Sequence, residues 1–89
     1  MSDNMQEDIE FLFETIAKIQ NAKDCRALFN DLCTYKEIDA MAQRLRSAQL
    51  LSSGATYEQV IKQTDISSAT LSRVSKSLKF GNGYKNVLK

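Results

Sequence analysis

The chain lacks histidine and proline altogether, and only three of its 89 residues are glycine. Proline and glycine are favoured in tight turns and hairpin loops, so their shortage favours an all-helical protein over one built from hairpins. The two cysteines, Cys25 and Cys33, form no Cys-x-x-Cys pattern, and without histidine the chain offers no zinc-binding motif. We interpret both cysteines as reduced residues on helix faces of a cytosolic protein, and we expect no metal site.

Long apolar runs and recognisable catalytic motifs are also missing. No apolar run approaches the roughly 18 residues of a transmembrane helix, and no signal-peptide pattern opens the sequence. We therefore expect a cytoplasmic protein without a membrane partner. The sequence has no histidine, no glycine-rich phosphate loop and no clustered pair of carboxylates on an identifiable cleft, so we expect no enzymatic activity. We interpret Tyr35, Tyr57 and Tyr84 as packing residues.

What the sequence does contain is an uneven distribution of charge, although its formal net charge is only +1. Residues 1–43 carry four cations against nine anions, a net charge of −5. Residues 44–89 carry eight cations against two anions, a net charge of +6. A basic second half indicates a surface for a polyanion such as DNA, and chance segregation of solvated charges is the alternative.

The amino-terminal part of the chain predicts two amphipathic helices. After a loose polar start over residues 1–7, apolar residues at helical spacing predict a helix over about residues 8–20. Phe11 gives that helix a second apolar side, which is more surface than a small monomer can cover, so we expect dimerisation. Asn21, three residues before Asp24, is typical of the N-cap of a second helix. The expected inward residues are Ile9, Leu12, Phe13, Ile16 and Ile19 in the first helix and Cys25, Leu28, Phe29 and Leu32 in the second.

A long third helix is predicted next. Thr34 with Glu37 forms a capping box that opens this helix. Gly54 is placed to end it after about Ser53, as the residue beyond the C-cap. Its expected inward residues are Ile38, Met41, Ala42, Leu45, Ala48 and either Leu50 or Leu51.

The following segment predicts two short helices joined by a tight turn, which is the pattern of a helix-turn-helix. Thr56 with Gln59 is a second capping box. Asp65 falls where the turn needs a left-handed backbone, a conformation that Asp tolerates better than most residues. Ser67 then caps a helix that runs to about Lys79. The residues expected to pack inside this motif are Val60, Ile61, Ile66, Leu71, Val74 and Leu78.

The second helix of this motif is unusually rich in small hydroxyl residues, which lower its intrinsic helix propensity. Such a composition is understandable if the helix enters a DNA groove, where short hydroxyls reach bases and phosphates without blocking the approach. Arg73 and Lys76 lie among these hydroxyl residues. We therefore predict a DNA-binding helix. Beyond it, the break at Gly81-Asn82-Gly83 precedes a final turn of helix through Tyr84, Val87 and Leu88.

A specific pattern in the second half of the chain matches a known family. It consists of Arg44-Leu45-Arg46, Leu50-Leu51, Gly54, Ala69-Thr70-Leu71-Ser72-Arg73, and then Ser75, Ser77, Leu78 and Lys79. With these residues the run from Thr34 to Leu78 resembles the Trp repressor superfamily and, within it, the small repressor-related proteins of the YerC/YecD type. The amino-terminal helices match that family only in length and character. The resemblance implies a homodimer with interlocked amino-terminal helices and one helix-turn-helix per protomer, reading half-sites about 34 Å apart.

The resemblance also implies which residues contact DNA. In the family, the first turn of the recognition helix makes base contacts, and the positions that match are Ser68, Ala69 and Ser72, with Ser67 and Thr70 beside them. Arg73 and Lys76 are expected to meet phosphates. Exposed helix positions or local caps are the alternative for the serines, and a surface ion pair is the alternative for Arg73. The expected DNA-binding set is Ser67, Ser68, Ala69, Thr70, Ser72, Arg73 and Lys76.

A co-repressor site is a separate implication of the resemblance. In the family, tryptophan lies between two arginines and near a threonine at a helix start. Val74 stands where the Trp repressor has a glycine that leaves room for the indole ring, so we expect no co-repressor. Tryptophan and another small ligand remain as alternatives, because an arginine pair can hold a carboxylate and stack on a flat ring. Glu58 stands where the repressor has a DNA-contacting arginine, so the operator sequence of the Trp repressor cannot simply be assigned to this protein. The possible ligand-binding residues are Thr34, Arg44, Arg73 and Ser77.

We therefore predict an all-α, Trp-repressor-like helical bundle that forms an intertwined homodimer. Residues 1–55 are expected to form the dimer core, residues 56–79 the helix-turn-helix and residues 80–89 a tail, within a single domain overall. The predicted function is that of a sequence-specific, repressor-like transcriptional regulator in a bacterial cytoplasm, with double-stranded DNA as its partner. The alternative is a helical interaction or dimerisation module that keeps the helix-turn-helix shape without specific DNA binding.

Overall fold

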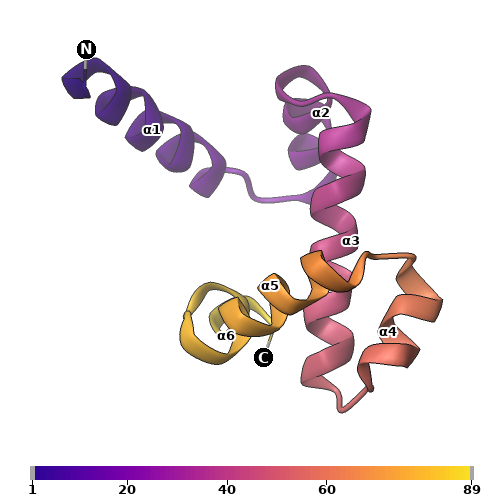
Figure 1. The fold of residues 1–89 in the computed structure, drawn as a ribbon. Coiled ribbons are helices and arrows are strands. Elements are labelled where there is room, and N and C mark those ends of the chain that lie inside the picture. The colour runs from indigo at the N-terminus through magenta and orange to yellow at the C-terminus, as the bar shows by residue number, and fades with distance from the viewer. Residues whose placement is uncertain (1, 89) are drawn as a thin grey trace. The chain divides into compact units, whose positions relative to one another are not determined.

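The computed structural model describes residues 2–88 and the side chains of residues 4–88. Over this range every regular element is a helix, which confirms the all-α prediction (Figure 1). The chain divides into two compact units, Met1–Tyr35 and Lys36–Lys89. Among the residues described, no helix is both long and apolar enough to span a membrane.

The amino-terminal unit begins with helix α1 (Ser2–Ala17). The loose start predicted for residues 1–7 is wrong from Ser2 onward, and Met1 lies outside the described residues. Met, Gln and Glu, which fill positions 5–7, are favourable helix formers, so the helix includes residues that were expected to be loose. It ends three residues before the predicted Gln20, where Lys18 and Ile19 donate backbone hydrogen bonds only three residues back and so tighten the last turn.

Helix α2 (Ala22–Leu32) begins as the sequence predicts. The Asn21 Oδ1 atom accepts a hydrogen bond of 2.8 Å from the backbone N–H of Asp24, which confirms the N-cap. The Asn21 side-chain amide also donates to an Asp24 carboxylate oxygen at 2.9 Å. The Asp24 carboxylate lies in the first turn of the helix, where the helix dipole favours a negative charge.

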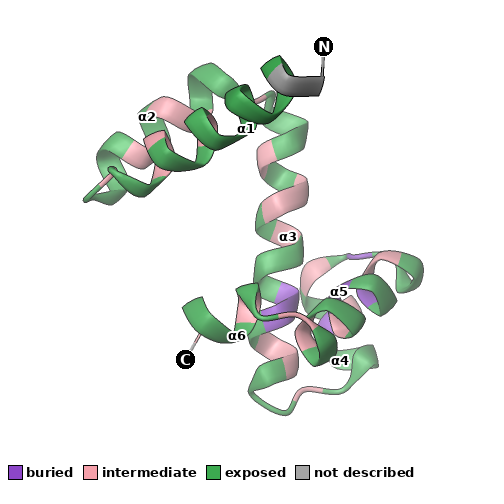
Figure 2. Cartoon of the chain, turned by 90° about the vertical axis from the view of Figure 1, so that its left-hand side faces the viewer, coloured by how far each residue is buried: buried purple, intermediate pink, exposed green. Residues whose placement is uncertain are grey.

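The amino-terminal unit has no buried core of its own among the residues whose side chains are described (Figure 2). Phe11 is 69% exposed, and Phe13 and Leu32, which were predicted to face inward, are 59% and 51% exposed. Two short helices offer too little facing surface to enclose these side chains within one unit. The apolar faces of α1 and α2 are therefore left open in the single chain.

The carboxy-terminal unit has a small, well-defined core. Helix α3 (Tyr35–Ser52) contributes to it through its last turns, and helices α4 (Tyr57–Thr64), α5 (Ser68–Phe80) and α6 (Gly83–Val87) surround those turns. The buried apolar side chains are Ala48, Val60, Ile66, Leu71 and Val74, with Leu50, Leu51, Ala55, Ile61, Tyr84 and Leu88 packed against them.

Two of the inward positions predicted on α3 are wrong for the single chain. Ala42 is exposed and Leu45 is 47% exposed, because the core reaches α3 only toward its end. Ser47, a polar residue that the apolar pattern passed over, is instead fully buried. Its hydroxyl donates to the Gln43 carbonyl oxygen at 2.7 Å, so the small side chain is satisfied within its own helix.

Local hydrogen bonds confirm the predicted turns of the helix-turn-helix. Gly54 adopts a φ of +97° just after α3. Thr56 Oγ1 accepts from the Gln59 N–H at 3.2 Å while the Gln59 side chain accepts from the Thr56 N–H at 2.8 Å, which completes the capping box. Asp65 has a φ of 64°, the left-handed conformation expected in the turn, and Ile66 beside it is 1% exposed.

The end of the chain also follows the predicted course. Helix α5 ends at Phe80, with Gly81 as its C-cap, and α6 forms the expected final turn. Tyr84 and Leu88 pack against the core, but Val87 is 75% exposed. A single helical turn can direct only part of its apolar side chains toward one neighbour.

Candidate nucleic-acid interface

The start of α5 is held by a compact pair of hydroxyl residues. The Ser67 hydroxyl oxygen accepts from the Thr70 N–H at 3.1 Å and its hydrogen is donated to Thr70 Oγ1 at 2.9 Å. The Ser67 hydroxyl is thus engaged in capping, whereas the Thr70 hydroxyl keeps its own hydrogen to donate. Of the expected DNA-binding residues, these two help to fix the position of the helix start.

The other expected DNA-binding residues share one exposed face of α5. Leu71 and Val74 lie on the opposite side of the helix and are 0% and 2% exposed. Core packing therefore sets how the helix is rotated and directs its polar side outward. We call this exposed set the recognition face; it consists of Ser68, Ala69, Ser72, Arg73 and Lys76.

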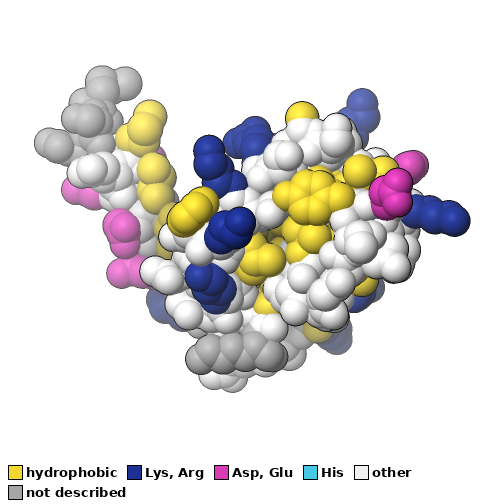
Figure 3. Space-filling view, turned by 60° about the horizontal axis from the view of Figure 1, so that its bottom comes forward, with side chains coloured by type: hydrophobic (Ala, Val, Ile, Leu, Met, Phe, Trp, Pro, Cys, Tyr) yellow, Lys and Arg dark blue, Asp and Glu magenta, His cyan; other side chains and the backbone are white. Residues whose placement is uncertain are grey.

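The recognition face carries two cationic side chains, Arg73 and Lys76. Arg73 and Lys76 make no ion pair with the carboxylates that the structure describes. This disfavours the surface ion pair that was the alternative for Arg73. Figure 3 shows Lys and Arg side chains in dark blue next to exposed apolar side chains in yellow. Both cations are therefore available for an anionic partner such as a phosphate backbone.

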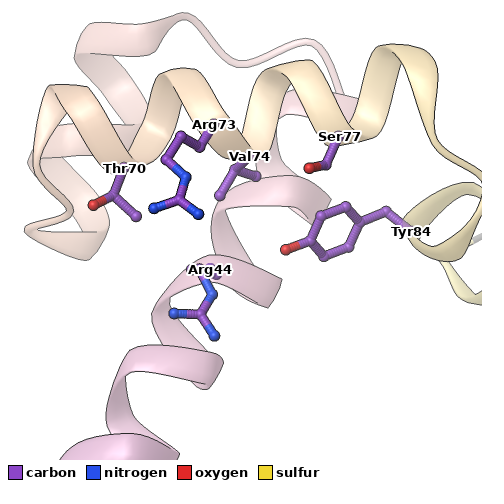
Figure 4. A pocket seen from close by; sticks show the side chains of 6 residues that line it. All are labelled: Arg44, Thr70, Arg73, Val74, Ser77 and Tyr84. Carbon is purple, nitrogen blue, oxygen red and sulfur yellow. The ribbon is translucent and has the colours of Figure 1, made fainter. Parts of the chain in front are cut away.

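A pocket of about 380 Å³ lies between α3, α5 and α6 (Figure 4). It brings together three of the four possible ligand-binding residues, Arg44, Arg73 and Ser77. Thr34 is not among the lining residues and belongs to the amino-terminal unit. The full lining consists of Arg44, Thr70, Arg73, Val74, Ser77 and Tyr84.

Tyr84 is a pocket residue that sequence reasoning missed. Its ring packs against the core, as expected for a packing residue, but its hydroxyl points into the pocket near Val74 (Figure 4). In the sequence, the position of Tyr84 just after the break at Gly81–Gly83 was only weak evidence for a role in a pocket. The residue lines the pocket because α6 folds back against α3 and α5.

The wall formed by Val74 limits what the pocket can hold. The branched side chain is 2% exposed and belongs to the core, so it cannot move aside without opening the core. The other lining groups are two guanidinium groups and three hydroxyl groups. These groups are hydrogen-bond donors suited to an oxyanion, whereas little apolar surface remains for a flat ring.

The described part of the chain has no group of three or more histidine, cysteine or carboxylate residues that could hold a metal ion. Cys25 and Cys33 are both free thiols and are half-buried. The polar groups that line the pocket beside α5 are cations and hydroxyl groups.

Comparison with known proteins agrees with this geometry. The family model described as Trp repressor protein matches residues 7–89. The uncharacterized protein YerC of Bacillus subtilis (strain 168) is 40% identical over 75 residues, covering 84% of this chain and 72% of YerC.

Two crystal structures share both the fold and part of the sequence. A candidate Trp repressor from Staphylococcus aureus superposes with a TM-score of 0.87 at 36% identity, covering 92% of this chain and 83% of that one. A TrpR-like protein from Eubacterium eligens ATCC 27750 gives 0.86 at 35% identity, covering 91% and 84%. The helix-turn-helix, the fold and the match along nearly the whole sequence lead to one conclusion: this chain belongs to the Trp repressor family.

Proposed function

We propose that this protein is a sequence-specific, repressor-like transcriptional regulator that binds double-stranded DNA as a homodimer in a bacterial cytoplasm. The family consists of DNA-binding regulators and not of enzymes. The observation that carries the proposal is the recognition face, which is exposed and cationic while the opposite side of α5 is buried. A helix held in this way can enter a major groove without disturbing the core.

Within the recognition face, the short and the long side chains have different roles. Ser68, Ala69 and Ser72 lie close to the helix backbone and are suited to touch base edges. Serine hydroxyls can donate or accept, so they discriminate bases poorly by themselves, whereas the Ala69 methyl can contact a thymine methyl. Arg73 and Lys76 reach further and contact phosphates, with water mediating part of the readout.

The homodimer in this proposal is supported by the open apolar faces of the amino-terminal unit. Met5, Phe11 and Phe13 are 64%, 69% and 59% exposed, and a second copy of the same unit is a self-complementary way to cover them. Residues 1–55 then form the dimer core, residues 56–79 read DNA and residues 80–89 form the tail. Each dimer presents two helix-turn-helices to half-sites about 34 Å apart.

The proposed regulator needs no tryptophan. Val74 occupies the wall of the pocket where the Trp repressor has glycine, and the remaining donors of Arg44 and Arg73 are free for phosphate contact. Tryptophan or another small co-repressor in this pocket is the alternative.

Selection of bound duplexes from a random DNA pool, with and without added tryptophan, tests this proposal. We expect a two-fold motif whose half-sites are one helical turn apart, because a symmetric dimer recognises a symmetric operator. The motif and its enrichment should be the same in both arms. Enrichment only with tryptophan would overturn the effector-free part of the proposal. Failure to recover a motif in either arm would favour the helical interaction module instead.

Replacing Arg73 with alanine is expected to weaken binding to the selected duplex by about 1–3 kcal/mol, the range of a good polar contact to DNA. The measurement is fluorescence anisotropy over a series of salt concentrations, in which the salt dependence should also become shallower by about one phosphate contact. Lys62→Ala removes the same charge from the exposed end of α4 and is the matched control. Equal affinity of Arg73→Ala and wild type would contradict the assignment of the recognition helix.

A further inference from the structure

A second groove runs along α5 and overlaps part of the recognition face. It has a volume of about 330 Å³ and lies between the first turn of α4 and the side of α5 from Ser72 to Phe80. We call it the Tyr57–Phe80 groove. Its lining residues are Tyr57, Ser72, Arg73, Ser75, Lys76, Lys79 and Phe80.

Two aromatic side chains border this groove without being buried. Phe80 is 77% exposed and Tyr57 is 44% exposed, although the same unit encloses Leu71 and Val60 completely. An exposed phenylalanine at the end of a helix contributes little to the fold, because most of its ring remains in water. Both rings are therefore available to a partner, and they lie in one groove rather than scattered over the surface.

The charge of the groove is entirely positive. Arg73, Lys76 and Lys79 line it, no acidic residue does, and none of the three forms an ion pair with a described carboxylate. A fourth cation is held nearby, since the Lys85 ammonium donates to the Lys79 carbonyl oxygen at 3.0 Å. The partner that complements this groove is therefore a polyanion that also offers flat apolar surface.

A base-paired duplex does not meet that description, because its base faces are already stacked on one another and only its edges and backbone are accessible. An unpaired strand offers both phosphates and free base faces. A cationic groove bordered by aromatic rings is the usual means by which proteins bind single strands without sequence preference. Serine hydroxyls of Ser72 and Ser75 add donors for the phosphates in between.

We propose that the Tyr57–Phe80 groove binds single-stranded nucleic acid, with bases stacked on Phe80 and Tyr57 and phosphates held by Arg73, Lys76 and Lys79. This goes beyond the proposed duplex recognition and does not require it, although the two sites share Ser72 and the cations Arg73 and Lys76. Because these cations cannot serve both partners at once, a single strand and a duplex compete for the same protomer.

Fluorescence anisotropy of the full chain with a labelled dT strand of about 12 nucleotides tests the proposal, since a strand of that length spans a typical single-strand site. Phe80→Ala is expected to weaken dT binding by about 5- to 150-fold, the range for losing one stacked base. Phe80→Tyr keeps an aromatic ring and should bind dT like wild type. Val87→Ala removes an equally exposed apolar side chain outside the groove and should also leave dT affinity unchanged.

Binding of the same variants to the selected duplex is measured in parallel, so that failure of this proposal can be distinguished from failure of the proposed function. Ala69→Leu places bulk on the recognition face outside the groove, so it should abolish binding to the selected duplex while dT binding persists. Absence of dT binding by wild type at low salt would overturn the groove proposal and leave the duplex proposal intact. Unchanged dT affinity in Phe80→Ala, or an equal loss of dT and duplex binding in that variant, would also overturn it, because the ring would then not stack on an unpaired base.

Discussion

Replacing Leu71 with alanine is expected to destabilise the protein by about 2–5 kcal/mol, the range measured for removing a buried leucine side chain. Leu71 is 0% exposed and belongs to a core with few buried apolar side chains, so its neighbours cannot readily close the cavity. Because a small domain has only about 5–15 kcal/mol of stability, such a loss removes a large share of it.

Urea denaturation followed by circular dichroism measures this effect, at one fixed protein concentration because unfolding of a dimer depends on concentration. Val87→Ala is the control, since Val87 is 75% exposed and its truncation should change stability by less than about 0.5 kcal/mol. A loss below about 1 kcal/mol for Leu71→Ala would show that Leu71 does not anchor α5 in the core. The recognition face depends on this anchor, because Leu71 and Val74 set which side of α5 faces outward.

The second large effect concerns the amino-terminal unit. We expect a dimer that does not dissociate without unfolding, because the unit has no buried residue among those whose side chains are described. Burial of each Phe11 ring contributes about 1.5–3 kcal/mol, and in a symmetric dimer both copies count. Phe11→Asp should therefore weaken the dimer by at least roughly 3–6 kcal/mol, with a further penalty for burying a charge.

Sedimentation equilibrium at micromolar concentration, combined with circular dichroism, tests this expectation. Gln6→Asp adds the same charge to an exposed polar position of α1 and should leave the dimer intact. A wild-type protein that sediments as a folded monomer would contradict the prediction. It would also remove the two-fold arrangement on which recognition of a symmetric operator depends.

The helix-turn-helix shows which parts of the fold follow directly from sequence patterns. The Thr56–Gln59 capping box, the left-handed Asp65 and the Ser67 cap were all predicted and are all present. Each is formed by residues no more than three or four positions apart, so the local sequence contains everything that the hydrogen bonds require. The start of α1 was missed because favourable helix formers extend a helix without a distinctive cap.

Burial on α3 shows where such patterns fail. Leu45 is apolar and at helical spacing, yet it is 47% exposed, while the polar Ser47 is fully buried. The Ser47 position is next to α4, where its hydroxyl oxygen is 3.4 Å from Thr64 Oγ1, so a small side chain is needed there. Helical periodicity cannot tell which turns of a long helix meet the core, because that depends on helices placed later in the chain.

The candidate sites also combine features that the sequence predicts with features that depend on the tertiary structure. Residue types and spacing alone determined a helix-turn-helix, its hydroxyl-rich second helix and the cations of Arg73 and Lys76, and a resemblance of the residues from Thr34 to Leu78 added the Trp repressor type. Only the tertiary structure decided that Tyr84 joins Arg44 in one pocket and that Tyr57 and Phe80 border one groove. Caps and turns depend on neighbours in sequence, whereas pockets and grooves depend on side chains that folding brings together from separate helices.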